Sequence, residues 1–563
     1  MSEEAAVPAG EEQRPAEAQK TQAEPPAKAP KTKKKAPKAP APTVPGVTPL
    51  PAKVAYPLAI ACGVLYFLAF PGIDVWPLSF VALVPLIVAL RGQTARRALG
   101  LGWLAGFTMT MVGFYWLLEM LKVFSGFPTP LCLVFMAILC GYQAGRIALC
   151  GWLYGRAEAR GWPAGPVFAL AFVASELCYP LLFPWYYGAT VHNAPVLMQT
   201  ADLGGPYLVG LVLVAANLAL AELILARREK RPLNRRLLLA GAIAPALGAL
   251  YGFVRMRSVD TAAAVAPEVK VGMVQGNQPL LGRNDALRVH FNRTAELRKA
   301  GVDLVVWSEG ASSQVQLETP ELDQVRHDIT NRLHIPTIIG TLLARPAKNP
   351  RPNKPGHGHD DYDYFNTAII ADKAGAIHGR YDKQYLLAFG EYLPLSETFP
   401  VLKEWSPNSS SFSSGTSIEA LPMDDHKITA MICYEDILPG FVNGMVRHAD
   451  PDLLVNLTND AWFGDSTEPF IHLALAKMRA VEHHRYLVRV TNSGVSALVD
   501  PVGRVVVHGG TFKEEVIIGV AKWMRSTNLY ELLGDWPWYL ASVIIAAMAF
   551  VPRSRVFKRS ASS

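Results

Sequence analysis

Residues 428–436 read Ile-Thr-Ala-Met-Ile-Cys-Tyr-Glu-Asp, an apolar run that ends on a cysteine and two acidic side chains. The run has the length and composition of a buried strand, and Pro439-Gly440 breaks the chain soon after it. Because open α/β sheets gather reactive groups beyond the ends of their strands, this stretch predicts such a sheet with the Cys433 thiol at its edge. A lone cysteine is more often an inert core residue, so the prediction depends on the rest of the chain.

Short apolar runs of the same kind recur between residues 267 and 525. The runs of strand length are Val269–Val274, Val302–Trp307, Ile335–Thr341, Thr367–Ala371, Ile428–Ile432, Leu453–Leu457, Leu487–Val490, Ser496–Val499 and Val505–Val507. Helical patterns lie between some of them, notably at 318–334 and 470–485. Near-continuous apolar strands that alternate with helices predict one α/β domain whose sheet faces are covered, and about 260 residues suffice for its core.

Two other strand ends in this half carry chemically useful side chains. The run at 302–308 leads straight into Glu309, and the run at 380–382 leads into Lys383. A carboxylate can take the proton of a thiol, whereas a lysine can lower the thiol pKa and stabilise an oxyanion. Glu309, Lys383 and Cys433 therefore suit acyl transfer through a thioester if they meet at one sheet edge. Taken singly, the glutamate and the lysine are more often ordinary surface charges.

The rest of the chain contains much longer apolar runs. They lie at about 54–72, 75–90, 100–121, 129–153, 164–183, 206–226 and 237–254, and an eighth lies at 537–551. A helical span needs about 20 predominantly apolar residues to cross the hydrocarbon core of a bilayer. The runs therefore predict a multi-pass α-helical membrane domain of about eight spans, of which the second and the eighth are the shortest.

Basic residues follow every second apolar run. Those after runs two, four, six and eight are Arg91, Arg96, Arg97, Arg156, Arg160, Arg227, Arg228, Lys230, Arg231, Arg235, Arg236, Arg553, Arg555, Lys558 and Arg559. Lys122 is the exception in the intervening loops. Since cytoplasmic loops carry an excess of lysine and arginine, this alternation predicts a cytoplasmic N-terminal tail and an extracytoplasmic α/β domain.

Composition limits the possible classes of protein. The chain has 563 residues, of which 50% are hydrophobic, and a net charge of +7. The positive charge sits in the tail and in short loops between apolar runs, which indicates membrane topology and disfavours nucleic-acid binding. Five of the six cysteines lie in apolar runs and no CxxC pair occurs, so the sequence predicts neither a disulfide framework nor a zinc site.

Four segments follow from these patterns. Residues 1–50, rich in Ala, Pro, Lys and Glu, predict a disordered basic tail. Residues 51–258 predict a seven-helix transmembrane region, and residues 259–530 the extracytoplasmic α/β domain. Residues 531–563 predict a final transmembrane helix and a basic cytoplasmic tail.

Several motifs carry a family resemblance. The segments Trp307–Glu309, Asp382-Lys383 with Phe389–Glu391, and Ile432–Asp436 resemble the Glu-Lys-Cys signature of the nitrilase (carbon–nitrogen hydrolase) superfamily, which implies an αββα sandwich. With the predicted spans, further segments resemble the apolipoprotein N-acyltransferase family over roughly residues 54–552. These segments are Val274–Asn277, Asn456–Gly464, Arg479–Glu482, Arg485–Arg489, Asn492–Ser496, Asp500–Gly503 and Gly534–Trp536.

The resemblance implies a role for each residue that matches a motif. It implies that Glu309 is the general base, that Lys383 stabilises the oxyanion and that Cys433 is the nucleophile. Glu391 and Glu435 would be supporting carboxylates, with structural ion pairing as the alternative. The remaining matched residues are Tyr434, as a positioning residue, and Asn459, Trp462 and Phe463, in a loop that either lines the substrate pocket or packs on itself.

The chain also departs from the family pattern. Ser308 stands where a proline usually precedes the base glutamate, and Ala388 stands where a proline usually precedes Phe-Gly-Glu. Residues 348–363, rich in Pro, Gly, His and Asp, resemble an insertion. Its two histidines, His357 and His359, have flanking glycines and no further ligand pattern, so a solvated loop is favoured over a metal site.

The resemblance implies transfer of a fatty acyl chain from a membrane phospholipid to the N-terminal amine of a diacylglyceryl-cysteine apolipoprotein, through a thioester on Cys433. This reaction is the last step of bacterial lipoprotein maturation, at the periplasmic side of the inner membrane, and it calls for no metal or organic cofactor. One alternative is a membrane-anchored amidase or nitrilase that hydrolyses a lipid-linked amide or ester. Another is a non-catalytic lipid-binding protein on a decayed enzyme domain, which the intact Glu309, Lys383 and Cys433 disfavour.

Overall fold

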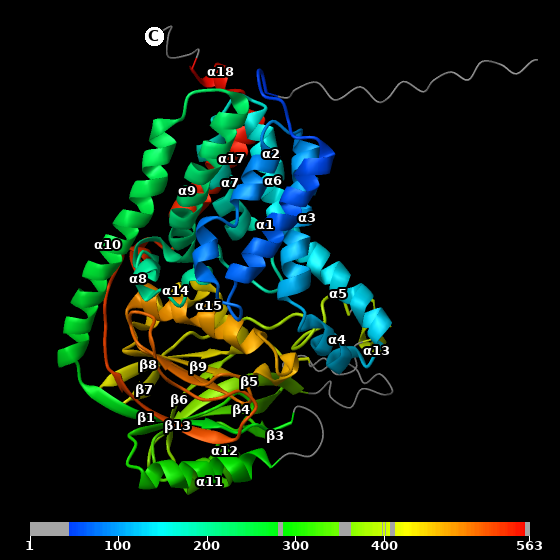
Figure 1. Ribbon diagram of the computed structural model, residues 1–563. Helices are drawn as coiled ribbons and strands as arrows, with labels where there is room; N and C mark the ends of the chain where they lie inside the picture. Colours follow the sequence, from blue (N-terminus) through cyan, green and yellow to red (C-terminus); the bar gives the residue numbers. More distant parts are fainter. Residues whose placement is uncertain are drawn as a thin grey trace, which may run out of the picture. The chain divides into compact units, whose positions relative to one another are not determined.

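The eight long apolar runs all contain helices (Figure 1). The computed structural model describes residues 44–279, 285–347, 362–396, 398–399, 401–405 and 411–557. Most of the predicted tail and most of the insertion, including its two histidines, lie outside these described residues. The helices of the apolar runs are α1 Ala52–Ala69, η1 Trp76–Phe80, α2 Val84–Leu90, α3 Ala95–Gly113, α4 Leu117–Ser125, α5 Thr129–Gln143, α6 Gly145–Glu158, α7 Ala164–Cys178, α9 Ala201–Glu229, α10 Arg235–Val265 and α17 Trp536–Phe550.

Helix length separates these elements into two groups. Within the described residues, α1, the continuous pair α5–α6, α9 and α10 are long and apolar enough to cross a membrane. The pair α3 and α4, bent by 71°, adds a fifth candidate span if it is counted as one. Trp76–Leu90, α7 and α17 are apolar but shorter. The prediction of a helical membrane domain is confirmed, whereas the number of eight spans stays a prediction.

The segment between α10 and α17 forms two β-sheets. Its strands are β1 Glu268–Gln275, β2 Leu304–Trp307, β3 Ser312–Leu317, β4 Thr337–Pro346, β5 Tyr362–Ala371, β6 Ile377–Asp382, β7 Leu421–Met423, β8 His426–Ile432, β9 Leu453–Thr458, β10 Leu487–Thr491, β11 Ala497–Val499, β12 Val505–His508 and β13 Glu515–Lys522. One sheet has the order β13-β1-β2-β4-β5-β6, with β3 beside β4, and the other has the order β12-β11-β10-β9-β8-β7. The central strands of each sheet run parallel.

Two helical layers cover the outer faces of the sheets. The helices and short turns of this domain are α11 Ala286–Lys299, α12 Asp323–Asp328, η3 Thr330–Arg332, α13 Val401–Trp405, η4 Cys433–Ile437, α14 Pro439–Ala449, η5 Asp460–Phe463 and α15 Glu468–His483. Buried residues such as Met273, Val306 and Val455 fill the space between the sheets. Figure 1 shows α14 and α15 on the side of the membrane helices and α11 on the opposite side. The predicted αββα sandwich is therefore confirmed.

Helix α15 connects the two halves of the chain. Its side chains Ile471, Leu475, Met478 and Val481 belong to the same buried cluster as the membrane helices. One face of α15 thus packs against the helical domain, while Leu473, Ala476 and Ala480 belong to the buried cluster of the α/β domain and pack against the outer face of the second sheet. This double burial explains why almost the whole helix is inaccessible to solvent, and it places the strand ends of the second sheet beside the membrane helices.

The pattern-based predictions of secondary structure were correct for the buried elements and incomplete elsewhere. Each predicted strand contains an observed strand, and the pattern at 470–485 is α15. The predicted helix at 318–334 is confirmed only in part, because the two short elements α12 and η3 form there in place of one continuous helix. The boundary predicted at residue 258 falls inside α10, which continues to Val265.

Candidate active site

Cys433 lies at the junction between β8 and η4. Its backbone φ is +51°, in the left-handed region that side-chain-bearing residues rarely adopt. Two side chains hold the turn: Glu435 Oε2 accepts a hydrogen bond from Ile432 N at 2.8 Å, and Asn456 Nδ2 donates one to Cys433 O at 3.1 Å. Strained backbone of this kind concentrates at functional sites, and here it turns the thiol out of the strand.

Lys383 follows β6 and contacts two glutamates. Its Nζ lies 2.7 Å from Glu391 Oε2 and 3.7 Å from Glu309 Oε1. Asn366 Nδ2 donates hydrogen bonds to Glu309 Oε1 at 2.7 Å and to Glu391 Oε1 at 3.1 Å, and Leu387 N donates one to Glu391 Oε2 at 2.8 Å. The structure therefore brings the two predicted residues Glu309 and Lys383 together. No motif in the sequence singles out Asn366, which lies within β5.

Burial and charge set the protonation states of these groups. Burial lowers the pKa of Lys383, but the neighbouring Glu391 and Glu309 outweigh it, so that the pKa lies above its usual range and the side chain is an ammonium. Burial raises the pKa of Glu309, and Lys383 opposes that shift. Burial, followed by the charge of Glu309, raises the pKa of the Cys433 thiol well above its ordinary value. The thiol thus keeps its proton at rest, and its reaction requires a base.

Glu435 and Tyr434 organise the chain around the cysteine. Glu435 Oε1 accepts hydrogen bonds from Tyr381 Oη and Gln384 N, both at 2.7 Å, and so ties the Cys433 turn to the segment that carries Lys383. Burial raises the pKa of Glu435 to about 7. The hydroxyl of Tyr434 donates a hydrogen bond to Leu182 O of the membrane domain at 3.0 Å.

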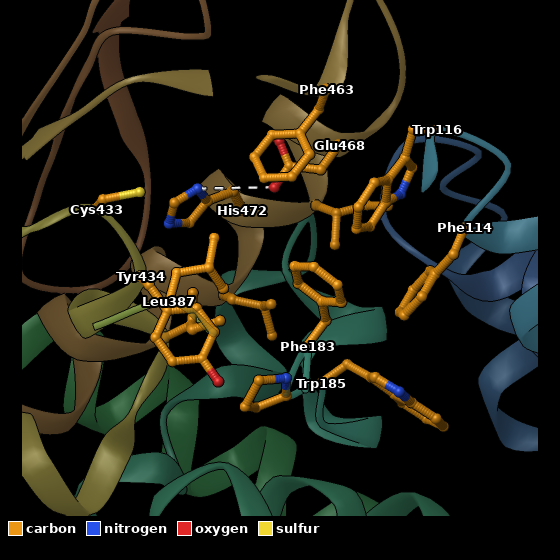
Figure 2. A pocket seen from close by; sticks show the side chains of 14 residues that line it. Phe114, Trp116, Phe183, Trp185, Leu387, Cys433, Tyr434, Phe463, Glu468 and His472 are labelled. Atoms are coloured by element: carbon orange, nitrogen blue, oxygen red, sulfur yellow. Dashed lines mark ion pairs between the residues drawn. The ribbon is translucent and has the colours of Figure 1, made fainter. Parts of the chain in front are cut away.

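A cavity of about 40 Å³ opens beside Cys433 between the two halves of the chain (Figure 2). Its lining consists of Phe114, Trp116, Phe183, Pro184, Trp185, Leu387, Cys433, Tyr434, Ile437, Phe463, Glu468, Ile471, His472 and Leu475. Of the three loop residues predicted from the sequence, Phe463 is in this lining. The side chain of Asn459 instead caps η5, and Trp462 stacks on Phe124 with ring centroids 4.4 Å apart. Most of the residues that line the cavity are apolar, which suits an acyl chain beside the thiol.

Comparisons with known proteins agree with this arrangement. The chain matches the model of the apolipoprotein N-acyltransferase N-terminal domain over residues 62–219 and the carbon-nitrogen hydrolase model over residues 270–522. The apolipoprotein N-acyltransferase of Azotobacter vinelandii is 31% identical over 513 residues, which cover 88% of this chain and 95% of that protein. The chain belongs to the apolipoprotein N-acyltransferase family.

This membership confirms the family and the enzyme class that the motifs predicted. The apolipoprotein N-acyltransferase of Geobacter metallireducens is 28% identical over 516 residues, which cover 89% of this chain and 96% of that protein. Among solved structures, Saccharomyces cerevisiae Nit3, a nitrilase-superfamily member, aligns at 18% identity with a TM-score of 0.34, covering 46% of this chain and 90% of that one. The curated relatives give the amidase alternative no support.

A second polar cluster of this acyltransferase lies behind the cysteine turn. Arg489 donates hydrogen bonds to Asp436 Oδ2 at 2.8 Å and to Asp460 Oδ2 at 2.9 Å. His472 Nε2 lies 2.8 Å from Asp436 Oδ1, and its Nδ1 lies 3.1 Å from Asp460 Oδ1. All four side chains are buried. Sequence reasoning missed this cluster, although an arginine inside the apolar run of β10 signals a buried charge that needs partners.

Asp460, Glu468 and His472 are placed closely enough to hold a cation. Their ligand atoms lie within 4.8 Å of one another. However, both ring nitrogens of His472 face carboxylates. Burial and Arg489 lower the pKa of this imidazole, but Asp436 and Asp460 outweigh them and raise it to about 10. A doubly protonated ring offers no lone pair to a metal, so the residues do not fit a metal site.

The charge of His472 predicts a pH-dependent contribution to stability. Because its pKa rises from 6.5 to about 10 on folding, the contribution is fully present below pH 6.5 and is lost as the pH rises through 10. We expect His472→Gln to lower the free energy of unfolding by about 3 kcal/mol at neutral pH, and the difference from the wild type to shrink towards pH 10. Thermal unfolding of both proteins in detergent between pH 6 and pH 10 measures this. A difference that grows with pH would contradict the assignment.

Proposed function

We propose that this acyltransferase moves a fatty acyl chain from a membrane phospholipid to the N-terminal amine of a diacylglyceryl-cysteine apolipoprotein, through a thioester on Cys433. The observation that carries the proposal is the position of the thiol. Lys383 and Glu309 act on it electrostatically, and it lines a cavity whose other wall includes Phe114 and Phe183 of the membrane domain. A site that must receive two lipid-anchored substrates needs both features.

In the first half of the reaction, Glu309 takes the proton of the Cys433 thiol while the sulfur attacks the ester carbonyl of the phospholipid. The C–S bond forms and the ester C–O bond breaks. Glu309 passes this proton to the ester oxygen of the departing lysophospholipid, which leaves as an alcohol. The ammonium of Lys383 stabilises the negative charge that develops on the carbonyl oxygen, and Glu391 and Asn366 hold the ammonium and the base in place.

In the second half, the amine of the acceptor attacks the thioester. The C–N bond forms, the C–S bond breaks, and the proton lost by the attacking nitrogen passes through Glu309 to the sulfur. The same ammonium stabilises the oxyanion again, so one cluster serves both halves. Glu435 and Tyr434 act as positioning residues, because their hydrogen bonds fix the turn of Cys433 against the Lys383 segment and the membrane domain.

The location of the enzyme is part of the proposal. The basic loops after every second apolar run support a multi-pass protein of the bacterial inner membrane, with the α/β domain on the periplasmic side and the tail in the cytoplasm. Protease added outside intact spheroplasts would test this orientation, because cleavage of the α/β domain only after lysis would contradict it.

Glu309→Gln is expected to slow acylation of Cys433 by labelled phospholipid about 100-fold or more. The amide keeps an oxygen that can accept the hydrogen bond from Asn366, so folding is preserved while the base is lost. The measurement is single-turnover acylation of the purified full-length enzyme in detergent. Wild-type acylation by the variant would contradict the role of Glu309.

The amidase alternative is tested with the same wild-type acyl-enzyme. On our proposal, a diacylated lipopeptide accelerates loss of the thioester and receives the label as an amide. Release of free fatty acid at one rate, with or without the lipopeptide, would support the hydrolase instead.

A further inference from the structure

Glu468, the first residue of α15, lines the same cavity as Cys433, and none of the steps above uses it. The residue is only 7% exposed. Its Oε2 has no hydrogen-bond partner among the described residues. Figure 2 shows the carboxyl group and the Cys433 thiol on opposite sides of the His472 ring in that view. A buried polar atom without a hydrogen-bond partner is energetically unfavourable. When such an atom lies in the wall of a binding cavity, it indicates that a group of the bound ligand pairs with it.

Glu468 shares its ion-pair partner, His472, with two carboxylates that lie closer to that ring. The groups that act on it are Asp460 from η5, His472 from α15, Arg489 from β10 and Asp436 from η4. In this set the two cations, His472 and Arg489, each already pair with the two aspartates. The other carboxylate oxygen, Oε1, lies 3.8 Å from His472 Nδ1, beyond hydrogen-bonding distance.

Burial, together with the charge of Asp460, raises the pKa of Glu468 well above its ordinary value. The resting side chain therefore holds a proton more tightly than a free carboxyl group does. A carboxyl with a raised pKa is also a stronger base once it has lost its proton. When a cation enters the cavity, the carboxyl group releases its own proton to solvent. The resulting carboxylate is then suited to take a proton from that cation.

The chemistry of the substrates identifies the group that Glu468 fits. Phospholipid esters and phosphates offer hydrogen-bond acceptors, whereas the free N-terminus of the acceptor offers N–H donors and, at neutral pH, a positive charge. An ammonium cannot attack a thioester until it has lost a proton. The second half of the reaction therefore needs a group that binds the ammonium and removes one proton from it, beside the acylated cysteine.

We propose that Glu468 binds the terminal ammonium of the acceptor and takes one proton from it, which delivers the neutral amine to the thioester on Cys433. The ammonium enters as the Glu468 proton leaves to solvent, and the carboxylate then accepts a proton from the nitrogen. The products of this step are a neutral amine and a neutral Glu468. The C–N bond then forms and the C–S bond breaks as described above, with Glu309 carrying the second proton. This inference rests on the proposed function.

The test uses the full-length enzyme with Glu468→Gln, Glu468→Ala and, as a control, the exposed acid Asp465→Asn. The acyl-enzyme is formed with labelled phospholipid and then chased between pH 6.5 and pH 9 with a diacylated lipopeptide or with hydroxylamine, an amine that is uncharged at neutral pH. We expect acylation within twofold of the wild type in every variant. Transfer to the lipopeptide at pH 6.5 should fall at least tenfold in both Glu468 variants, and the defect should shrink towards pH 9 as the free amine predominates.

Transfer to hydroxylamine should stay at the wild-type rate in both Glu468 variants, since this acceptor needs no deprotonation. Wild-type transfer to the lipopeptide by Glu468→Gln at pH 6.5 would overturn the inference. A defect that is independent of pH and extends to hydroxylamine would overturn it too, because it would indicate a structural role. Failure of the wild type to form any acyl-enzyme would instead refute the proposed function.

Discussion

Replacing Cys433 with alanine is expected to reduce acyl transfer at least about 10³-fold and to leave no acyl-enzyme. Glu309 and Lys383 remain in contact in this variant, so the base and the oxyanion-stabilising charge persist without a nucleophile. The substitution removes one sulfur atom from the wall of a cavity and keeps a side chain at the same backbone position. We therefore expect the melting temperature to change by only a few degrees.

The measurement combines steady-state transfer to a diacylated lipopeptide with trapping of the acylated protein. Cys433→Ser is a second test, because a hydroxyl has a far higher pKa than a thiol and is a poorer nucleophile with the same base. Cys178→Ala is the matched control, since this cysteine is exposed on a membrane helix away from the cavity. Transfer by Cys433→Ala at the rate of the control would exclude a thioester at this position.

Replacing Lys383 with methionine is expected to have the second largest effect. Methionine fills a similar volume but removes the ammonium that lies between Glu309 and Glu391. Two largely buried carboxyl groups then share Asn366 without a counter-ion, so one of them becomes protonated. We expect a loss of acyl transfer of at least about 100-fold, because both half-reactions lose the charge that stabilises the oxyanion.

The same substitution should also lower the free energy of unfolding by about 3 kcal/mol, since it breaks a buried ion pair from one side. Parallel measurement of single-turnover acylation and of thermal unfolding separates the two effects. Lys427→Met, on an exposed position of β8, controls for the loss of a lysine. Acylation at the wild-type rate in Lys383→Met would remove the lysine from the mechanism.

Local patterning predicted the buried strands because their signal lies in consecutive residues. Strand β9 is buried at every residue and β8 is buried from Ile428 to Ile432, since both faces of their sheet are covered. By contrast, β13 has alternating buried and exposed residues, and β6 contains the polar residues His378 and Arg380. These two strands lie at the ends of their sheet, where one side faces solvent or another segment, so their composition resembles that of loops.

The reactive residues were predictable for a similar reason. Glu309, Lys383 and Cys433 each lie within two residues of the end of a strand. The single sheet edge expected from the sequence is wrong, because β2 and β6 belong to one sheet and β8 to the other, and the site forms where the strand ends of the two packed sheets meet. The partners that fix them were not predictable, because Asn366 and Arg489 reach the site from other strands. The bend between α3 and α4 was also missed, because the apolar run at 100–121 predicts one straight span. This bend brings Phe114 and Trp116 to the cavity.

The covalent state of Cys433 tests the central claim most directly. The full-length enzyme, incubated with phospholipid of known acyl composition, is digested and the mass of the peptide that contains residue 433 is measured. We predict that this peptide gains the mass of one acyl chain and loses it again when a diacylated lipopeptide is added. Sustained transfer to the lipopeptide while Cys433 stays unmodified, or an acyl adduct on another residue, would contradict the account.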